Sequence, residues 1–336
     1  MPVTSTAVVI LNYNGAHLLQ QFLPGVIKHS PQAQIVVADN ASTDESREVV
    51  LKNFPAVKLI ALDKNYGFSG GYNRALQQID ATYCVLLNSD VDVTEGWLQP
   101  MVELLDKHPD IAAVQPKILA CNNREFFEYA GAGGGFLDAL GYPFCRGRLF
   151  DYLEKDTGQY NDTRQVFWTS GACMMVRTSV YKDLGGLDED FFAHMEEIDL
   201  CWRIMRANKK AYYTGSSVVY HVGAGTLAYG HPRKIYLNFL NNLRLLVYHL
   251  PTCELAWKLP MRITLDWVAA LRFLFQGKTG AFAAVFKAHG NLAKHFKSVL
   301  RKRQHWKTRL PFRAEMMYKG LIVWDYFIRN KTRIMR

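Results

Sequence analysis

The sequence predicts an α/β fold with a mostly parallel central sheet, followed by a C-terminal α-helical region. The first observation is a set of short β-branched apolar runs separated by segments of helical periodicity: AVVILN (7–12), QIVVADN (34–40), VKLIAL (57–62) and YCVLLN (83–88). The second is composition, because 336 residues with 49% hydrophobic and 13% aromatic content can bury a large core. Strands that alternate with helices are typical of parallel sheets covered on both faces.

The segments between these strands predict helices with identifiable ends. HLLQQFLPGVI (17–27) has apolar residues at helical spacing, and we expect Pro24 to end or kink this helix. STDES predicts the start of the next helix, with Ser42 or Thr43 as its N-cap. YNRALQQI (72–79) predicts a third helix after a glycine-rich loop.

Further along the chain the pattern continues with one interruption. VFWTSGACMMVRTSVY (166–181) predicts a strand followed by a short helix, an amphipathic helix follows from Glu196, and AYYTGSSVVYH (211–221) predicts a strand. Residues 121–165 show few periodic patterns, and we expect a mobile loop region there.

The net charge of +10 conceals an asymmetry between two parts of the chain. Residues 231–336 hold 21 Lys and Arg against 4 Asp and Glu, whereas residues 1–230 hold 19 against 26. An acidic body with a basic C-terminal region indicates an anionic partner, either nucleic acid or an anionic membrane face. No recognised nucleic-acid-binding module accompanies the charge, so we expect no nucleic acid partner.

The C-terminal region predicts apolar helices at 235–250 and 263–275, both interrupted by charged residues. These interruptions leave no apolar run of about 18 residues, so a spanning helix is not expected. Basic helices with Trp and Phe suit the plane of a membrane interface, with RKRQHWKTR (301–309) as an anionic-lipid patch. The alternative is a helical cap packed on the rest of the chain, with a solvated basic face.

Cysteine usage and the N-terminus indicate the compartment. The six cysteines are scattered without zinc-type spacing, which favours small buried side chains in a reducing environment. MPVTSTAVVILNYNG has no basic segment before its strand-length apolar run, so we expect no signal peptide and a cytoplasmic protein.

Polar clusters follow three of the predicted strands where the strands end. They are Asn12, Tyr13 and Asn14, then Asp39 and Asn40, and finally Asn88, Asp90 and Asp92. Because ligands of open parallel sheets bind beyond the carboxyl ends of the strands, we expect the clusters to share one crevice. The alternative is that each cluster only forms a turn or a helix cap.

The carboxylates of Asp90 and Asp92 in LNSDVDV (87–93) would repel each other if both were ionised without a cation nearby. Mg²⁺ or Mn²⁺ would supply that charge and would also bind phosphate oxygens of a substrate. A metal and diphosphate site is therefore the hypothesis that we favour. Paired carboxylates that hydrolyse a sugar bond remain an alternative on spacing alone.

The loop DKNYGFSGGYNRAL (63–76) adds an anion-binding feature. Gly67, Gly70 and Gly71 allow close backbone approach, and the helix that follows offers free N–H groups. The loop matches neither the P-loop nor the GxGxxG dinucleotide fingerprint, which disfavours nucleoside triphosphate hydrolysis and nicotinamide chemistry.

The ordered motifs VVILNYNG, VVADNASTD, NYGFSGGYNRAL and LLNSDVDV resemble the inverting family 2 glycosyltransferases with a GT-A fold, in particular their bacterial rhamnosyltransferase-like branch. The resemblance spans about residues 6 to 225. It implies a nucleotide-sugar donor, with Asp39 bound to the base, Asp90 near the ribose and metal, and Asp92 as the direct metal ligand. The remaining donor-binding residues that it implies are Asn12, Tyr13, Asn14, Asn65, Gly67, Gly71, Asn73 and Asn88.

The second acidic cluster, in EEIDLCWR, lies in the first turn of the predicted helix. Glu196, Glu197 and Asp199 cannot all be caps, and an inverting transfer needs one carboxylate to take the acceptor proton. The resemblance implies Glu197 as the catalytic base, with Glu196 as the alternative, although the family more often has Asp at this position. It also implies that His221 binds the metal.

The acceptor side is predicted from WTSG. The resemblance places Trp168, Thr169, Ser170 and Gly171 at the acceptor, with Asp188 and Asp190 as weaker candidates near the rim.

The sequence therefore predicts a catalytic domain at 1–230 and a basic amphipathic region at 231–336. We expect metal-dependent, inverting transfer of a hexose, with rhamnose on thymidine diphosphate as the family-weighted donor. The expected acceptor is a lipid-linked saccharide of cell-surface polysaccharide, met at the inner face of the membrane. A glycoside hydrolase and a non-catalytic saccharide-binding protein remain the alternatives.

Overall fold

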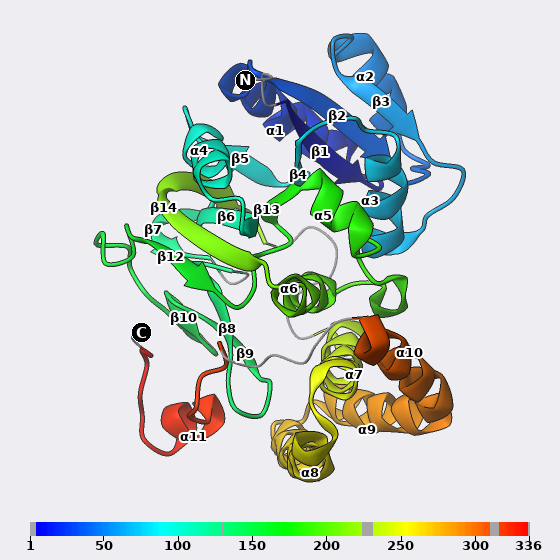
Figure 1. Ribbon diagram of the computed structural model, residues 1–336, viewed down its shortest axis with the longest axis vertical. Helices are drawn as coiled ribbons and strands as arrows, with labels where there is room; N and C mark the ends of the chain where they lie inside the picture. The colour runs from blue at the N-terminus through cyan, green and yellow to red at the C-terminus, as the bar shows by residue number, and fades with distance from the viewer. Residues whose placement is uncertain (1–4, 129–130, 224–230, 310–315, 335–336) are drawn as a thin grey trace.

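The computed structural model describes residues 5–128, 131–223, 231–309 and 316–334. Its centre is a ten-stranded mixed sheet in the order β12-β14-β6-β13-β4-β1-β2-β3, with β5 beside β14 and β7 beside β6 (Figure 1). In chain order the strands of this sheet are β1 (Thr6–Asn12), β2 (Ala33–Asp39), β3 (Lys58–Ala61), β4 (Tyr83–Asn88), β5 (Val91–Val93), β6 (Ile111–Ala120), β7 (Asn123–Phe127), β12 (Thr163–Val166), β13 (Cys173–Arg177) and β14 (Lys210–His221).

The strand directions confirm the mostly parallel sheet. β1, β2, β3 and β4 run the same way, and β6 and β14 share that direction because β13 lies antiparallel between β4 and β6. Only β12 and β13 in the linear order run the other way. The carboxyl ends of β1, β2 and β4 therefore meet at one edge, as the sequence predicted.

Helices cover both faces of the sheet because side chains alternate along each strand. Val8 and Ile10 of β1 pack in one hydrophobic cluster, and Ala7 and Val9 pack in the other. The first cluster takes in α1 (Ala16–His29), α2 (Ser46–Asn53) and α4 (Gln99–Lys107). The second takes in α3 (Gly67–Gln77), α5 (Thr178–Asp183) and α6 (Glu196–Arg206).

Two local expectations about helix ends were wrong. α1 continues through Pro24 to His29; the carbonyl that loses its partner belongs to Gln20, which is exposed, so water can replace the missing N–H. α2 begins at Ser46, so neither Ser42 nor Thr43 is its N-cap. Asp44 accepts from the Ser46 N–H at 3.1 Å instead.

The loop expected at 121–165 differs most from the structure. Besides β7 and β12, the segment forms a four-stranded antiparallel sheet. Its strands are β8 (Gly135–Leu137), β9 (Pro143–Cys145), β10 (Arg148–Leu149) and β11 (Tyr152–Leu153). Strands of two or three residues are too short to show a period. The glycines instead mark close packing, since a Cβ on Gly135 would lie 2.1 Å from the Trp168 ring.

The C-terminal helices pack under the sheet and α6, at the end of the molecule away from β3 (Figure 1). They are α7 (Pro232–His249), α8 (Thr252–Phe275), α9 (Thr279–Lys294), α10 (Phe296–Arg309) and α11 (Ile322–Phe327). α7 contributes Leu240, Leu243 and Leu246 to the same hydrophobic cluster as α6. Across the described residues, each helix lacks either the length or the continuous apolar character that crossing a bilayer requires.

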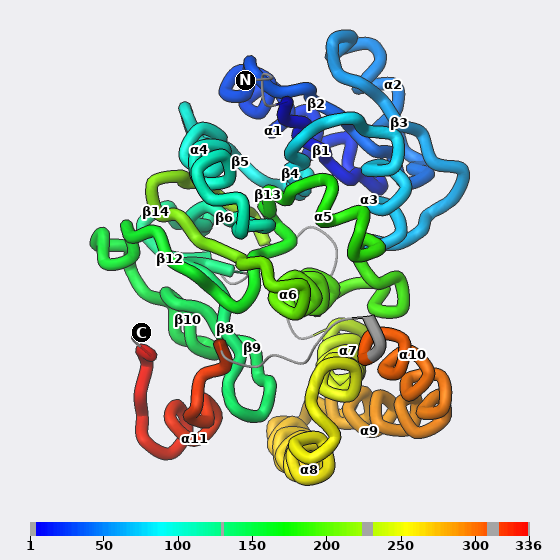
Figure 2. The backbone as a smooth tube through the Cα atoms, viewed as in Figure 1, coloured from blue at the N-terminus to red at the C-terminus, as the bar shows by residue number. Residues whose placement is uncertain are grey.

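The chain returns to the small sheet near its C-terminus. Figure 2 shows the segment around α11 beside β8 and β9, although the two are far apart in the sequence. The Tyr318 N–H donates to the Leu137 carbonyl at 2.7 Å, and the Ile322 N–H donates to Asp138 at 3.0 Å. Burial raises the pKa of Asp138 to about 6, although the backbone N–H groups that donate to its carboxylate lower the pKa.

Candidate active site

The ends of β4 and β14 bring Asp90 and His221 together. His221 Nε2 lies 3.1 Å from Asp90 Oδ1 and 3.3 Å from Asn88 Nδ2, and both Asp90 and His221 are buried. Glu128, which follows β7, lies on the other side of the ring with Oε1 3.5 Å from His221 Nδ1. Asp90 and Glu128 therefore lie on opposite sides of the His221 imidazole, with Asn88 on the Asp90 side, beyond the carboxyl end of the sheet.

Asp92 lies apart from this group, and its role as the direct metal ligand stays a prediction. Asp92 lies in β5 in register with Tyr220, and His221 follows Tyr220 on β14, so their side chains alternate to opposite faces. Asp92 Oδ2 pairs with Arg124 Nη2 at 2.5 Å, and the Arg124 guanidinium stacks over the Tyr220 ring. Asp90 lies in the turn between β4 and β5, where strand alternation does not apply.

The charges around His221 fit a cation. Burial alone would lower the pKa of His221, but Asp90 and Glu128 raise it to about 10, so the pocket favours positive charge. His221 Nδ1 is buried and faces Glu128 Oε1 at 3.5 Å. No cluster of three or more His, Cys, Asp and Glu in the described chain is arranged as a complete metal cage. A divalent ion there would need oxygens from a substrate, which is how Mg²⁺ sites on phosphates are built.

The predicted nucleotide pocket lies at the ends of β1 and β2. Asn12 is fully buried and donates through Nδ2 to Asp39 Oδ1 at 3.4 Å and to Ser42 Oγ at 3.2 Å. Arg47 Nε donates to Asp39 Oδ2 at 2.5 Å, so both carboxylate oxygens of Asp39 are already engaged. Tyr13 is exposed at the edge of this group.

Asn14 closes the same corner. It has a φ of 51°, and its Oδ1 accepts from the Thr43 N–H at 2.7 Å, while its own N–H donates to Ser42 Oγ at 2.9 Å. The first two strand-end loops are therefore tied to each other.

The glycine-rich loop is held in shape by amides. Asn40 Oδ1 accepts from the Tyr66 N–H at 2.9 Å, and Asn65 Oδ1 accepts from the Gly67 N–H at 2.8 Å. Gly67 has a φ of 70°, and a Cβ there would lie 2.9 Å from the Phe192 ring. A Cβ on Gly71 would lie 2.6 Å from Leu11, so α3 can only approach β1 this closely with glycine.

Asn73 links α3 to a neighbouring segment of the chain. Its Nδ2 donates to the Leu187 carbonyl at 2.8 Å, and its Oδ1 accepts from the Tyr181 hydroxyl at 2.7 Å and from the Leu187 N–H. These bonds anchor α3 to the segment before α6, and the donor-binding role of Asn73 stays a prediction.

The two glutamates at the start of α6 are chemically distinctive. The Oε2 atoms of Glu196 and Glu197 are both buried without a hydrogen-bond partner among the described residues. Burial raises the pKa of Glu197 to about 7 against the backbone N–H groups that lower it, and burial and then the Glu197 charge raise the pKa of Glu196 well above its ordinary range. A carboxylate with a pKa near neutrality suits a general base.

Glu197 is the glutamate that faces the donor elements. A Cβ added to Gly171 would lie 3.9 Å from the Glu197 Cβ and 3.3 Å from the ring of Phe68, which belongs to α3. Glu197 therefore lies next to Gly171, with Phe68 of α3 close by.

Asp199, the third acid of the cluster, is structural. It accepts from Arg203 at 2.6 Å and from His249 Nε2 at 2.7 Å, all three being buried. Although burial alone would raise the pKa of Asp199, Arg203 and His249 lower it to about 2. His249 stacks on Trp202, so this carboxylate joins α6 to the end of α7.

The loop before α6 is unusual and was missed by sequence reasoning. Phe192, His194 and Met195 have φ values of 58°, 68° and 77°, a conformation that non-glycine residues rarely adopt. Asn241 of α7, fully buried, donates through Nδ2 to the carbonyls of Phe191, Ala193 and His194 at 2.9, 3.0 and 2.9 Å. The three asparagines in the apolar helical run 235–250, Asn238, Asn241 and Asn242, were the available signal.

His194 in this loop is a further polar group that the sequence did not indicate. Burial, with a smaller contribution from the Lys234 charge, lowers its pKa to about 4, so the ring is neutral at neutral pH. Its Nε2 is buried without a partner among the described residues, like the free oxygens of Glu196 and Glu197.

The predicted acceptor residues are mostly enclosed. Trp168, Thr169 and Ser170 are buried: Trp168 donates to the Phe136 carbonyl at 2.9 Å, and Ser170 accepts from the Ala172 N–H at 3.2 Å. Gly171 lies beside Glu197, and the acceptor role of all four residues stays a prediction.

Asp188 and Asp190 are also engaged elsewhere. Asp188 caps the turn at Asp190, and both carboxylates pair with Lys302 of α10. Arg303 donates to the carbonyls of Val247 and Leu250. The anionic-lipid patch expected at 301–309 is therefore contradicted at Lys302 and Arg303, which instead fix α10 to the body.

The fold and the site define an α/β protein whose candidate site lies beyond the carboxyl ends of its parallel strands. Residues 7–185 match the family model described as glycosyl transferase family 2, and the chain belongs to that family. The expected family is confirmed.

Two curated relatives illustrate the similarity. An N-acetylglucosaminyl-diphospho-decaprenol L-rhamnosyltransferase of Mycobacterium tuberculosis is 27% identical over 233 residues, which cover 64% of this chain and 75% of the relative. A low-salt glycan biosynthesis hexosyltransferase of Haloferax volcanii is 26% identical over 209 residues, covering 60% of this chain and 62% of the relative.

Solved structures confirm the GT-A fold. GalNAc-T7 with UDP, GalNAc and Mn²⁺ is similar with a TM-score of 0.58 and 16% identity, over 88% of this chain and 58% of that chain. The mannosyltransferase PcManGT from Pyrobaculum calidifontis in complex with GDP-Man and Mn²⁺ is similar with a TM-score of 0.53 and 14% identity, over 91% of this chain and 86% of that chain. Identities this low carry the fold alone.

Proposed function

We propose that this family 2 glycosyltransferase is a metal-dependent, inverting hexosyltransferase. It moves a sugar from a nucleotide-diphosphate donor to a hydroxyl group of a lipid-linked saccharide. The observation that carries the proposal is the pairing of Asp90 with His221 at the carboxyl end of the sheet, together with the Glu197 Oε2 atom, which is buried without a hydrogen-bond partner among the described residues.

Asp90 and His221, with Asn88 beside them, would hold Mg²⁺ or Mn²⁺. The negative surroundings support this choice, as does the Mn²⁺ in the two structural neighbours. When bound, such an ion offsets the charge that develops on a departing nucleoside diphosphate. Asp92 has no part in this proposal.

The donor nucleotide would lie over the ends of β1 and β2. Asn12 and Tyr13 line that corner, and Gly67 and Gly71 let the backbone of α3 approach the donor. Asp39 would have to exchange its bond with Asn12 to accept one from the base. Thymidine diphosphate rhamnose is the first donor to test, because the Mycobacterium tuberculosis relative is a rhamnosyltransferase.

Glu197 would take the proton from the acceptor hydroxyl as the hydroxyl attacks the anomeric carbon. Its pKa near 7 leaves a substantial ionised fraction at neutral pH while it remains basic enough to accept a proton. Gly171 leaves space for the acceptor beside this carboxylate, and His194 offers a neutral ring on the same loop.

The C-terminal region 231–336 would bring the enzyme to an anionic membrane. In α8 the residues at one helical face, Lys258, Arg262, Asp266 and Ala270, are buried, and the opposite face is apolar and exposed. The exposed apolar residues of α8 are Trp257, Met261, Trp267, Val268, Leu271, Leu274 and Phe275.

Helix α8 thus has charged residues on its buried face and apolar residues on its exposed face. The buried charged residues are stable there because they are paired. Arg262 Nε donates to Asp266 Oδ1 at 2.9 Å, and His289 lies 3.2 Å from Asp266 Oδ2. A helix that turns its ion pairs inward and its Trp and Phe side chains outward suits a lipid interface.

The test replaces Glu197 with Gln in the full chain. Transfer from thymidine diphosphate rhamnose with Mn²⁺ should fall by roughly 10²- to 10⁴-fold, while the donor dissociation constant stays nearly unchanged. Glu196→Gln is the matched control and should keep most of the activity. NMR of the product should show an inverted anomeric centre.

Wild-type rates in the Glu197→Gln variant would disprove the assignment of the base. Hydrolysis of a glycoside without any nucleotide, or tight saccharide binding without turnover on any nucleotide sugar, would disprove the proposed reaction.

A further inference from the structure

A pocket of about 510 Å³ opens between α7 and α9 at the end of these helices that is near the catalytic loop; we call it the α7–α9 pocket. Its apolar lining is made by Phe192, Pro232, Tyr236, Leu237, Ala283 and Ala284. Small residues on α9 leave this space open: a Cβ on Gly280 would lie 3.0 Å from the Pro232 ring. The volume is in the range of pockets that bind small apolar ligands.

One residue joins this pocket to the site of transfer. Phe192 lines the pocket and precedes the Asn241-bound loop that leads into Glu196 and Glu197. Its carbonyl accepts from the Phe68 N–H at 3.2 Å, and its ring fills the space that a side chain at Gly67 would need. Phe192 therefore connects the pocket to the start of α3 and to the loop of the base.

The pocket combines apolar walls with two cations. The Arg233 guanidinium lies 5.4 Å from the Phe192 ring centroid, and Lys287 Nζ lies 5.7 Å from the Tyr236 ring centroid. Both cations also line the pocket.

We propose that the α7–α9 pocket binds the hydrocarbon chain of the acceptor next to its diphosphate, with Arg233 and Lys287 bound to the diphosphate. The proposal rests on the proposed function, in which the acceptor is a lipid-linked saccharide. An isoprenoid diphosphate has the matching chemistry, because a branched apolar chain is joined directly to a multiply charged anion. With the chain in the pocket, the sugar on the other side of the diphosphate points toward Phe192 and the loop of Glu197.

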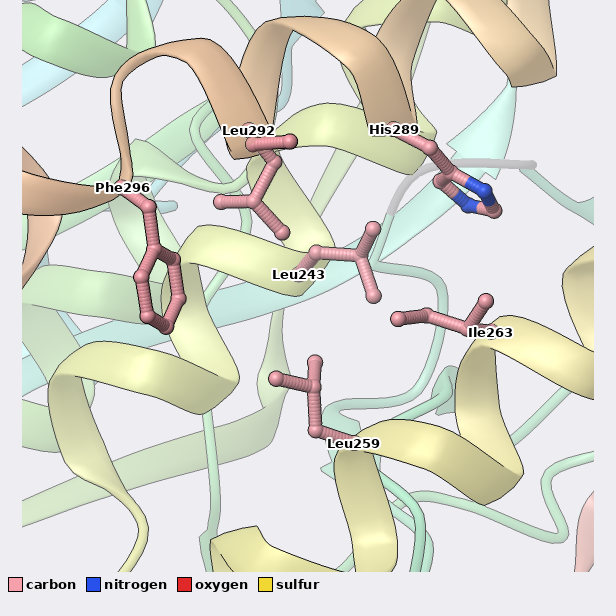
Figure 3. A pocket seen from close by; sticks show the side chains of 7 residues that line it. Leu243, Leu259, Ile263, His289, Leu292 and Phe296 are labelled. Carbon is pink, nitrogen blue, oxygen red and sulfur yellow. The ribbon is translucent and has the colours of Figure 1, made fainter.

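A second hollow nearby serves as a comparison. It has a volume of about 330 Å³ and lies between α7, α8 and α9, where Leu243, Leu259, Ile263, Leu292 and Phe296 point into a common space with His289 at one end (Figure 3). Its lining residues include no Lys or Arg. Because it offers a diphosphate no cation, we expect no isoprenoid diphosphate there.

The test uses the full chain and farnesyl diphosphate as a soluble probe, with affinity measured by calorimetry. Ala283→Trp fills the α7–α9 pocket from an exposed position, and Ala293→Trp, also exposed on α9, fills the second hollow. We expect the dissociation constant to rise by about tenfold or more in Ala283→Trp, which corresponds to losing about two buried methylene groups. Ala293→Trp should bind like wild type.

The charge requirement is tested separately. Arg233→Gln and Lys287→Gln should weaken farnesyl diphosphate binding and leave farnesol binding nearly unchanged, whereas Lys294→Gln, elsewhere on α9, should change neither. Melting temperatures and donor affinities equal to wild type would show that each variant is folded.

The outcomes separate this proposal from the proposed function. Wild-type probe affinity in Ala283→Trp, or equal affinity for diphosphate alone and for farnesyl diphosphate, would overturn the pocket assignment. Probe binding that depends on Ala283 in a protein that transfers no sugar would keep the pocket and disprove the transferase reaction. Transfer to a lipid-linked acceptor with an unchanged KM in Ala283→Trp would support the transferase reaction and disprove the pocket assignment.

Discussion

At the scale of single residues, the surroundings of three carboxylates of this chain determine what each can do. Asp199 is buried between Arg203 and His249 and has a pKa of about 2, whereas Glu197, whose Oε2 atom is buried without a hydrogen-bond partner among the described residues, has a pKa of about 7. Asp92 is paired with Arg124 at the surface. Only a carboxylate like Glu197 can exchange a proton near neutral pH.

The roles of Asp90 and Asp92 can be separated by metal dependence. Asp90→Asn should raise the Mn²⁺ concentration needed for nucleoside diphosphate binding by at least about tenfold, because the ion loses its carboxylate partner beside His221. Asp92→Asn should leave it unchanged, since Asp92 is bound to Arg124. A thermal-shift titration of Mn²⁺ with thymidine diphosphate measures both, and the opposite ranking would contradict the site.

The pKa of Glu197 sets a pH profile. Because burial raises that pKa from 4.5 to about 7, kcat/KM should rise as the pH increases through about 7 and then level off. Glu196→Gln should keep this rise, and a profile already flat between pH 5 and pH 8 would contradict it.

The same group affects stability with the opposite sign. A raised folded-state pKa means that Glu197 contributes stability below its ordinary value of 4.5 and that this contribution is lost as the pH rises through about 7. The enzyme should therefore gain activity over the pH range in which this residue ceases to stabilise the fold.

At the scale of elements, α7 positions the catalytic loop from outside the predicted catalytic domain. Asn241 binds three carbonyls of a loop that contains three left-handed residues, and Arg244 Nη1 donates to the Asp190 carbonyl at 2.7 Å. The strain of that loop is compatible with a stable fold only if these bonds persist.

Removing Asn241 should therefore reduce catalysis without removing any contact to the donor. Asn241→Ala should lower kcat by about tenfold or more, leave the donor dissociation constant unchanged, and lower the free energy of unfolding by about 1–3 kcal/mol, because three buried carbonyls lose their donor. Denaturant unfolding and initial rates measure these effects.

Asn242→Ala is the matched control. Asn242 is equally buried on α7 but bonds to the Gly141 carbonyl and to Arg262, away from the catalytic loop. It should lose similar stability and keep kcat; equal losses of kcat in both variants would show that Asn241 acts through stability alone.

At the scale of the whole molecule, the exposed apolar face of α8 lies at the end opposite to β1–β3 (Figure 1). The side chain of Phe275 is 86% exposed, and Trp267 stacks with Phe286 of α9. Apolar area of this extent is unfavourable in water, so a bilayer surface would stabilise it.

Vesicle binding tests this face. Trp267→Ser with Phe275→Ser should weaken binding to vesicles containing anionic lipid by roughly tenfold or more, because both side chains lose transfer from water to the interface. Leu51→Ser, at an exposed apolar residue of α2, should have no effect. Co-sedimentation measures the bound fraction, and unchanged binding in the double variant would contradict the membrane face.

The sequence by itself determined the alternation of strands and helices, the family, the strand-end clusters and the acidic start of α6. These features are local, because a buried strand, a turn and a helix face each need only a few neighbouring residues of a given polarity. The short strands in 121–165 and the inward charges of α8 could not be predicted, since tertiary packing against Trp168, Asn242 and His289 selects them.

Only the tertiary structure decided which polar residues act together. The turn at Asp90 breaks strand alternation, so Asp90 reaches His221 while Asp92 faces Arg124. α7 packs against the loop before Glu196, and hydrogen bonds from its Asn241 hold in place the loop's three residues with positive φ. Spacing along the chain sets which side chains are neighbours in one element, but the register between strands and the contacts between distant elements determine which of them meet.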